Sequence, residues 1–303
     1  MIDYHRLNLN DRDIYNRYLQ NCGERGCEYS FTNLFLWGRQ KAAFVEGFLT
    51  LFSQFDRRSV YPFPVGDGDL RPVLDAIIHD ARTRGIPCCL SSLTAADCQT
   101  LETLYPGAFR IYCDRNTFDY VYAIDDLADL KGRKFQKKRN HVNRFLQNHP
   151  DCVALPLNEQ TRGAAFGLLR AWYAAREAAD PHSDFHLEKL ALERAFAFQT
   201  QLGLEGMVLM EGGQAIAFAM GSRLNGDTFD IHFEKAREDI DGAYAAINRA
   251  FAQHLREKYP EVKWLNREDD LGIEGLRKAK LSYNPDHMVE KYWARLWETE
   301  DEN

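Results

Sequence analysis

The sequence predicts an α/β protein made of two consecutive domains that share one order of elements. Segments with helical and with strand periodicity alternate along all 303 residues. Each half reads as a strand, two helices, a hairpin, a further strand, a helix, a strand, a helix and a closing strand. The length suits two domains, and 45% hydrophobic with 27% charged residues is typical of a soluble globular protein. We therefore expect domains at 1–128 and 129–303.

Apolar periodicity assigns the elements of the first half. Residues 11–19 and 30–40 read as helices, and 42–55 as a hairpin because Glu46-Gly47 interrupts an apolar run. Thr94 is a good N-cap for the helix that follows it. The other predicted elements are a helix from Leu70, a strand at 86–90, a helix at 94–104 and two strands within 109–124.

The second half opens with a basic connecting helix at 131–148. No acidic residue lies between Asp129 and Asp151, and Phe135, Val142 and Phe145 form an apolar stripe. The chain as a whole carries a formal charge of -7, so DNA is not expected as a partner. A uniformly positive surface in an acidic protein favours a local phosphate ligand, although a solvated helix face would have the same pattern. The positive residues are Lys131, Arg133, Lys134, Lys137, Lys138, Arg139 and Arg144.

Further along, a strand at 228–234 alternates apolar and titratable residues. Asp230, His232 and Glu234 fall on one face, which either meets solvent or lines a cleft where acid/base chemistry is possible. The other predicted elements are strands at 153–157, 206–211, 214–223, 262–265 and 288–296, and helices at 162–179, at 187–202, from 243 and from 272.

The densest polar stretch is 266–283. The apolar run 262–265 stops at Asn266, four charged residues follow, and a helical segment then carries Arg277, Lys278 and Lys280. We interpret this as a strand, a charged turn and a helix, and ligands in open α/β folds lie at the carboxyl ends of strands. The alternative is that one acid caps the helix while the other charges pair at the surface.

Cysteine spacing and hydropathy indicate the compartment. The seven cysteines include no Cys-x-x-Cys and no nearby histidine at ligand spacing, so we expect reduced thiols and no metal. No run of about 18 apolar residues is present, and the start has no apolar segment of a signal peptide. A soluble, cytoplasmic protein is expected.

Three segments resemble a known bacterial family. Residues 137–141, 241–244 and above all 266–283 (Asn-Arg-Glu-Asp-Asp-Leu-Gly-Ile-Glu-Gly-Leu-Arg-Lys-Ala-Lys-Leu-Ser-Tyr) are similar to the C-terminal domain of phosphatidylglycerol lysyltransferases. The resemblance implies tandem GNAT-like (GCN5-related N-acetyltransferase) domains, each a mixed, mostly antiparallel sheet flanked by helices. It also implies kinship with Fem-type aminoacyltransferases, whose donor is aminoacyl-tRNA.

One departure concerns coenzyme A. Acetyltransferases of this fold carry Gln/Arg-x-x-Gly-x-Gly/Ala, whose backbone N–H groups hold the pyrophosphate. Here the stretch 237–244 keeps one glycine and adds Asp239 and Asp241, which would repel a pyrophosphate. An amino-bearing donor fits the acids of 268–270 better.

The leading hypothesis is an acyltransferase that moves an aminoacyl group from aminoacyl-tRNA to a small-molecule or lipid acceptor. Such a transfer needs positioning and oxyanion stabilisation rather than a covalent nucleophile. We assign donor phosphates to Lys134, Lys137, Lys138 and Arg139. We assign substrate binding to Tyr244, Asn266, Arg267, Glu268, Asp269 and Asp270, oxyanion stabilisation to Lys278 or Lys280, and proton transfer to Tyr283 or Glu234.

Two alternatives stay open. The first is an N-acyltransferase that uses a coenzyme A thioester on a small amine, with the Gly66-Asp-Gly68 turn before a helix as the cofactor site. The second is a non-catalytic module that presents the basic helix to RNA or another polyanion, which would leave the acids of 268–270 without a role.

Overall fold

The computed structural model describes residues 1–23, 25–55, 58–179 and 185–297, and the chain divides into two compact units. Unit 1 comprises Met1–Asp119, Asp269–Gly272 and the segment from Val289 onward. Unit 2 comprises Tyr120–Glu268 and Ile273–Met288. The chain therefore returns to unit 1 twice. A division at residue 128 assigns both of these later segments to the second domain.

Unit 1 holds one sheet with its own helices. Its strands are β1 (His5–Arg6), β2 (Gln40–Val45), β3 (Phe48–Phe55), β4 (Arg58–Pro62), β5 (Val65–Gly66), β6 (Cys89–Leu93), β7 (Phe109–Cys113) and β15 (Tyr292–Leu296). Its α-helices are α1 (Arg12–Leu19), α2 (Phe31–Trp37), α3 (Leu70–Arg84) and α4 (Ala95–Leu104), and its 3-10 turns are Leu9–Asp11, Cys27–Tyr29 and Arg115–Thr117.

The strand order in unit 1 joins distant parts of the chain. Among the described residues the order is β1-β2-β3-β4-β6-β15-β7, with β5 beside β3. β15, from the end of the chain, is antiparallel to both β6 and β7. The inner face of α3, with Val73, Leu74 and Ile77, is fully buried in a core that also includes Ala294 of β15. The closing strand is thus part of the first hydrophobic core.

Unit 2 holds the second sheet. Its strands are β8 (Asp119–Ala123), β9 (Val153–Pro156), β10 (Glu205–Glu211), β11 (Gln214–Arg223), β12 (Thr228–Ala236), β13 (Trp264–Asp269) and β14 (His287–Val289). Its helices are α5 (Ile124–Asp129), α6 (Gln136–Asn148), α7 (Arg162–Ala179), α8 (His186–Ala197), α9 (Gln199–Leu202), α10 (Ala243–Lys258) and α11 (Glu274–Leu281), with a 3-10 turn at Arg133–Phe135.

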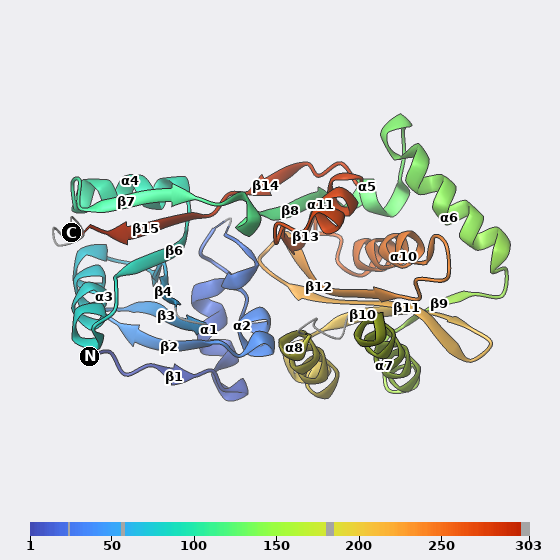
Figure 1. Cartoon of the computed structure of the whole chain (residues 1–303), viewed down its shortest axis with the longest axis horizontal. Coiled ribbons are helices and arrows are strands. Elements are labelled where there is room, and N and C mark those ends of the chain that lie inside the picture. The colour runs from blue at the N-terminus through green and yellow to red at the C-terminus, as the bar shows by residue number, and fades with distance from the viewer. Residues whose placement is uncertain (24, 56–57, 180–184, 298–303) are drawn as a thin grey trace. The chain divides into compact units, whose positions relative to one another are not determined.

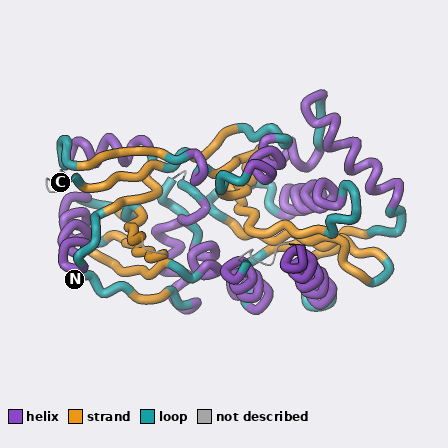
Figure 2. Tube along the Cα trace, in the orientation of Figure 1, coloured by secondary structure: helices purple, strands orange, loops and turns teal. Residues whose placement is uncertain are grey.

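The second sheet is a mixed layer between helices. Its order is β14-β8-β13-β12-β11-β10-β9, and β9 to β12 are antiparallel whereas β12 and β13 are parallel. α10 covers one face and α7 with α8 the other (Figure 1). Figure 2 shows the same layering, with the orange strands between purple helices. Ile247, Phe251 and Leu255 of α10 are buried in the core of this unit.

The parallel pair β12 and β13 opens along its length. The two strands are in register over three residue pairs, from Thr228 with Trp264 to Asp230 with Asn266. Beyond Asp230, β12 also contains a bulge, because Ile231 and Phe233 oppose consecutive residues of β11 and His232 is the extra residue. The second halves of β12 and β13 therefore separate, and their side chains can meet in the gap between the strands.

Most predicted elements are confirmed within a few residues. The hairpin at 42–55 is β2 and β3, and Thr94 caps α4 in a capping box with Asp97. One prediction was wrong: β13 does not stop at Asn266 but continues through Asp269, and α11 begins at Glu274 rather than near 272. The strand continues because its charged side chains find partners on neighbouring elements. No described helix is long and apolar enough to cross a membrane.

Candidate functional site

The candidate site lies where β12 and β13 separate in unit 2. Glu268 of β13 has a φ of 57°, a left-handed conformation that a residue with a side chain rarely adopts inside a strand. The fully buried Asn266 holds this kink, because its Oδ1 accepts a hydrogen bond from the Glu268 N–H at 2.7 Å. Strain of this kind clusters at functional sites. The kink also determines the direction of Arg267, which lies between these two residues.

Arg267 and Glu234 bridge the gap between the two strands. The Arg267 guanidinium donates to Glu234 Oε2, and the two side chains are only 15% and 12% exposed. The other carboxylate oxygen, Oε1, accepts a hydrogen bond from Asn248 Nδ2 of α10 at 2.9 Å. Both oxygens of Glu234 are therefore engaged, and one carboxylate connects β12, β13 and α10.

An aromatic ring and a second cation complete the cluster. Tyr283, which follows α11, is buried, and its ring centroid lies 4.9 Å from the Arg267 guanidinium. The half-buried Lys138 of α6 places its Nζ 3.8 Å from the same centroid. The Arg267 guanidinium is also 5.7 Å from the ring centroid of Tyr122 in β8. Residues from six elements or loops thus meet around one ion pair.

The electrostatics of the cluster follow from burial and from its two cations. Burial lowers the pKa of Lys138, the nearby positive charge of Arg267 lowers it further, and the result is about 8. Burial raises the pKa of Tyr283 to about 12 although Arg267 opposes the shift. Burial would lower the pKa of Arg267, but the adjacent Glu234 carboxylate raises it overall. At neutral pH the site therefore contains a permanent cation and a lysine close to its titration point.

A second polar group lies beside this cluster on the same two strands. The His232 side chain is fully buried, and its Nδ1 lies 3.0 Å from Glu268 Oε1 and 3.4 Å from Asp230 Oδ2. Its Nε2 is 2.9 Å from Ser222 Oγ of β11. Asp230, His232 and Glu268 offer atoms close enough together to hold a metal ion, a grouping that the cysteine and histidine spacing did not predict. In this structure His232 contacts Glu268 directly and so helps to fix its side chain.

Unit 1 has a separate buried charge cluster around Lys291. Its Nζ lies 2.6 Å from Asp119, 2.7 Å from Glu28 and 2.7 Å from Asp269. Burial would lower the pKa of Lys291, but these carboxylates raise it well above its usual value. Burial raises the pKa of Asp269 despite Lys291. Cys27 completes this group with an Sγ 3.6 Å from Asp119 Oδ1. The cluster joins three segments of unit 1 that are far apart in sequence.

The structure distributes the predicted substrate-binding residues over both units. Asn266, Arg267 and Glu268 lie in unit 2, as described above, whereas Asp269 and Asp270 belong to unit 1. Asp270 is fully buried and accepts a hydrogen bond from the Gly272 N–H at 3.1 Å, as expected for a turn. Tyr244, on α10, is 40% exposed. The three consecutive acids therefore belong to different units, and their role in binding an amino group stays a prediction.

The predicted catalytic lysines lie on α11. Lys278 is exposed, whereas Lys280 is buried and donates from Nζ to the Glu268 carbonyl at 3.2 Å. The carbonyl of Lys280 in turn accepts a hydrogen bond from the Tyr122 hydroxyl at 2.9 Å. Lys280 therefore also supports the kink at Glu268, while Tyr283 and Glu234 lie in the cluster itself. The catalytic roles of these four residues stay predictions.

The four residues assigned to phosphates differ in their surroundings. Lys134 pairs with Asp126 at 2.7 Å, and Arg139 donates to backbone carbonyls of Leu130 and Gly132. Lys137 is exposed, and Lys138 belongs to the Glu234 cluster. The positive charge of this region is therefore partly neutralised by Asp126. Of the four residues, Lys137 is the one whose side chain is exposed and has no role in the contacts above.

The loop that replaces the pyrophosphate motif is closed by ion pairs. Asp239 pairs with Arg237 at 2.6 Å, and Asp241 with Arg144 of α6 at 2.8 Å. Gly242 has a φ of 84°, and a Cβ there would lie 2.5 Å from the His141 carbonyl oxygen. Glycine is needed here for the close approach of α6. The charges of Asp239 and Asp241 are thus neutralised by arginines. Gly242, in contrast, has a packing role, because it lets α6 approach this loop.

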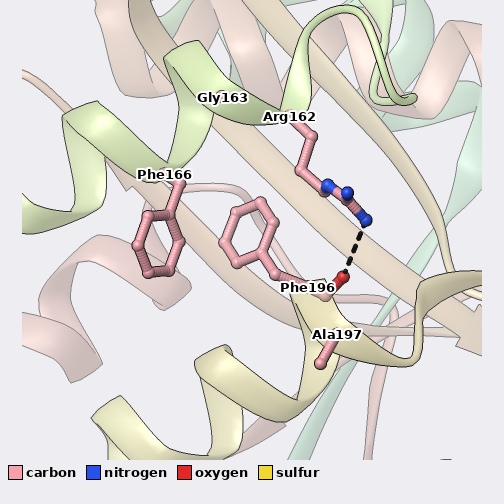
Figure 3. Close-up of a pocket in the computed structure, with 5 residues that line it drawn as sticks. All are labelled: Arg162, Gly163, Phe166, Phe196 and Ala197. Atoms are coloured by element: carbon pink, nitrogen blue, oxygen red, sulfur yellow. Dashed lines mark hydrogen bonds between the residues drawn. The ribbon is translucent and has the colours of Figure 1, made fainter.

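A surface pocket in unit 2 has a different character. It has a volume of about 450 Å³ and is lined by Arg162, Gly163, Phe166, Phe196 and Ala197 (Figure 3). Figure 3 shows the Arg162 side chain directed at the Phe196 carbonyl, with 3.5 Å between Nη1 and the oxygen. Two phenylalanines and one arginine supply no acid/base pair, so the pocket is a weaker candidate than the Glu234 cluster.

Sequence reasoning missed Asn248, Tyr122 and Lys291. Asn248 follows Ile247 on the buried side of α10, and it is 5% exposed. A polar residue beside the apolar stripe of a predicted helix was the available signal, because buried amides need hydrogen-bond partners. Tyr122 and Lys291 gave no local signal, since their partners lie far away in sequence.

Comparison with known proteins identifies the fold. The structure of L-PGS from Bacillus licheniformis aligns over 96% of this chain and 93% of that one, with a TM-score of 0.66 at 14% identity. FemX aligns over 98% of both chains with a TM-score of 0.62 at 9% identity. A tandem GNAT protein from the clavulanic acid pathway aligns over 99% of this chain and 100% of that one, with a TM-score of 0.50 at 9% identity. The predicted tandem GNAT-like fold is confirmed.

Closer relatives share the sequence as well. A conserved protein of unknown function from Bacteroides thetaiotaomicron is 38% identical, with 98% of this chain and 100% of that one covered and a TM-score of 0.91. An uncharacterized protein of Mycoplasmoides gallisepticum is 26% identical over 181 residues, which is 59% of this chain and 56% of that relative, so the match spans little more than half of its length.

The family comparison covers most of the chain. Residues 20–295 match the model of the phosphatidylglycerol lysyltransferase C-terminal domain, and this range includes the three segments that carried the resemblance. The chain therefore belongs to the phosphatidylglycerol lysyltransferase C-terminal family.

Proposed function

We propose that this chain is an aminoacyltransferase that moves an aminoacyl group from aminoacyl-tRNA to an amine or hydroxyl acceptor. Its family membership supports a transferase. The observation that carries the proposal is the Arg267–Glu234 pair in the gap between β12 and β13, with Lys138 and Tyr283 against it. A fixed cation, a fixed carboxylate and a lysine near its titration point are groups suited to the attack of an amine or a hydroxyl on an ester.

The reaction assigns a task to each group. The acceptor atom forms a bond to the ester carbonyl carbon, the bond from that carbon to the ribose oxygen breaks, and the proton of the acceptor ends on the ribose oxygen. Negative charge grows on the carbonyl oxygen, and the Arg267 guanidinium is the group that offsets it. Lys138 in its neutral form takes the proton from the acceptor and returns it to the leaving oxygen. Glu234 keeps Arg267 in place.

The tRNA would be held mainly through its phosphates. The exposed side of α6 and of the turn before it carries Arg133 and Lys137, on the same helix that brings Lys138 to the site. Phosphate contacts position a nucleic acid without reading its sequence. Binding should therefore weaken steeply with added salt.

The test is enzyme-dependent transfer of radiolabelled aminoacyl groups from a charged tRNA pool to hydroxylamine, a small nucleophilic probe. We expect acceleration by the wild type, loss of about 100-fold in Arg267→Met, as for removal of an oxyanion donor, and little change in the surface control Arg223→Met, whose partner is Glu261. Transfer that survives Arg267→Met would refute the site.

Ligand-induced stabilisation separates this proposal from its alternatives, because a ligand that binds only the folded state raises Tm. A shift with charged tRNA that high salt abolishes supports the proposal. A shift with acetyl-coenzyme A alone would reassign the chain to N-acylation of small amines, and salt-sensitive tRNA binding without transfer would reassign it to polyanion binding.

A further inference from the structure

Two polar atoms beside Glu234 have no partner among the described residues. Asn248 Oδ1 and Arg267 Nη1 are both buried, and neither has a hydrogen bond there, although Asn248 Nδ2 and Arg267 Nη2 both donate to Glu234. An ionised carboxylate accepts but does not donate, so the NH₂ of Asn248 must face Glu234 and its oxygen must point elsewhere. The orientation of the amide is thus fixed by chemistry.

Such atoms are uncommon in folded proteins. A buried acceptor or guanidinium N–H without a partner loses its hydration and gains nothing in return. Native structures retain few of them, and each calls for an explanation such as a functional contact. Here one acceptor and one donor lie on the two sides of a single carboxylate. A group that satisfies both atoms has an N–H or O–H donor and an acceptor oxygen close together.

We propose that Asn248 and Arg267 together recognise a free α-aminoacyl group, which deepens the proposed function and rests on it. The α-amino group donates to Asn248 Oδ1, beside the negative charge of Glu234, and the carbonyl oxygen accepts from Arg267 Nη1. An acyl group without an α-amino nitrogen, such as acetyl, supplies only the acceptor and leaves Asn248 Oδ1 buried without a bond. Asn248 is thus the residue that distinguishes an aminoacyl donor from a simple acyl donor.

Entry to these atoms requires a side chain to move. Lys138 is the group held least firmly, because its ammonium contacts the Tyr283 ring and makes no ion pair with a carboxylate in the described chain. Asn248, by contrast, is 5% exposed and anchored in the middle of α10. The recognition group Asn248 is therefore held by the fold, as a preorganised site requires.

The test compares two stable probes by calorimetry: 3′-(L-alanylamino)-3′-deoxyadenosine and 3′-(propanoylamino)-3′-deoxyadenosine, which lacks the α-amino nitrogen. Both carry the carbonyl, and only the first carries a free amine. We expect the wild type to bind the free amine about tenfold more tightly, equivalent to about 1.4 kcal/mol.

The variants separate the two contacts. Asn248→Ala should weaken only the free amine and so remove the preference, while Arg267→Met should weaken both probes by a similar factor. Urea unfolding of each variant checks that the site is still folded, and the two-probe comparison on the wild type needs no variant at all.

Equal affinity of the wild type for the two probes, or binding of neither, would overturn the inference, as would an Asn248→Ala protein that keeps the preference. If charged tRNA still supports transfer to hydroxylamine in that case, only the recognition by Asn248 and Arg267 is wrong. If that transfer is absent as well, the proposed function has failed too.

Discussion

The Arg267 guanidinium donates a hydrogen bond to the Glu234 carboxylate across the point where β12 and β13 separate, and the two residues are 33 positions apart in the chain. Neither side chain would be stable so deeply buried without the other, because a buried charge without a partner is strongly destabilising. The ion pair therefore keeps the gap between the strands polar. It also brings a fixed positive charge to the place where the proposed function puts an ester carbonyl.

Lys138 should give the transfer reaction a pH dependence. Its pKa of about 8 means that the neutral amine, which accepts a proton, forms as the pH rises through that value. We expect the transfer rate to increase with pH around a midpoint near 8, and this limb to disappear in Lys138→Met. The exposed neighbour variant Lys137→Met is the control and should keep the limb. A midpoint that persists without Lys138 would assign the titration to another group.

The same residue should affect stability. The pKa of Lys138 is lower in the folded protein than the value of about 10.4 in an unfolded chain, so the unfolded state binds more protons between pH 8 and 10. The contribution of Lys138 to the free energy of unfolding should therefore increase with pH between pH 8 and 10. Urea unfolding at several pH values should show a smaller slope in Lys138→Met than in the wild type; identical slopes would contradict the burial of the ammonium.

Replacement of Lys291 with Met should destabilise unit 1 strongly. The change leaves Glu28, Asp119 and Asp269 without their shared cation, and removal of one partner from a buried ion pair costs about 3–5 kcal/mol. Urea unfolding measures the loss. The exposed Lys41→Met in the same unit is the control, with an expected change within about 0.5 kcal/mol. Similar stabilities of the two variants would show that the carboxylates do not depend on Lys291.

Thr94→Ala should lower the free energy of unfolding by about 1 kcal/mol. The Thr94 hydroxyl accepts from the Asp97 N–H at 3.1 Å, and the Asp97 carboxylate accepts from the Thr94 N–H at 2.8 Å, so the variant loses half of a capping box. Thr103→Ala in the same helix is the matched control, because its hydroxyl binds only a carbonyl within the helix. Chemical denaturation should show a lower free energy of unfolding for Thr94→Ala and no clear change for Thr103→Ala.

Leu271→Gly should stabilise the protein by about 0.5–1 kcal/mol. Leu271 has a φ of 59° and a side chain that is 58% exposed, so the left-handed backbone costs energy that packing does not recover. Glycine adopts this conformation without strain, which stabilises the folded state. Part of this stabilisation is lost because glycine gives the unfolded chain more conformational entropy. Leu271→Ala retains the strain and is the control. A thermal unfolding midpoint that rises equally in both variants would locate the effect in the leucine side chain instead.

The sequence by itself determined the elements and the family. Apolar periodicity located the helix α3 and the hairpin of β2 and β3, and Thr94 was correctly predicted as a cap. These features depend on residues three or four positions apart or on alternation, which are local and readable. Glu234 was selected as a candidate because it falls on the titratable face of a predicted strand, and Arg267 and Tyr283 because they lie in the polar stretch 266–283.

Only the tertiary structure decided which of these side chains meet. It assigned Glu268 to unit 2 and Asp269 and Asp270 to unit 1, placed Lys138 against Tyr283 of the Glu234 cluster, and revealed Asn248 as a partner of Glu234. It also placed β15 in the first sheet and β8 in the second. Local patterns report which face of an element is buried. They do not report which distant element covers that face, because strand order and the direction of a kink such as Glu268 follow from the packing of the whole chain.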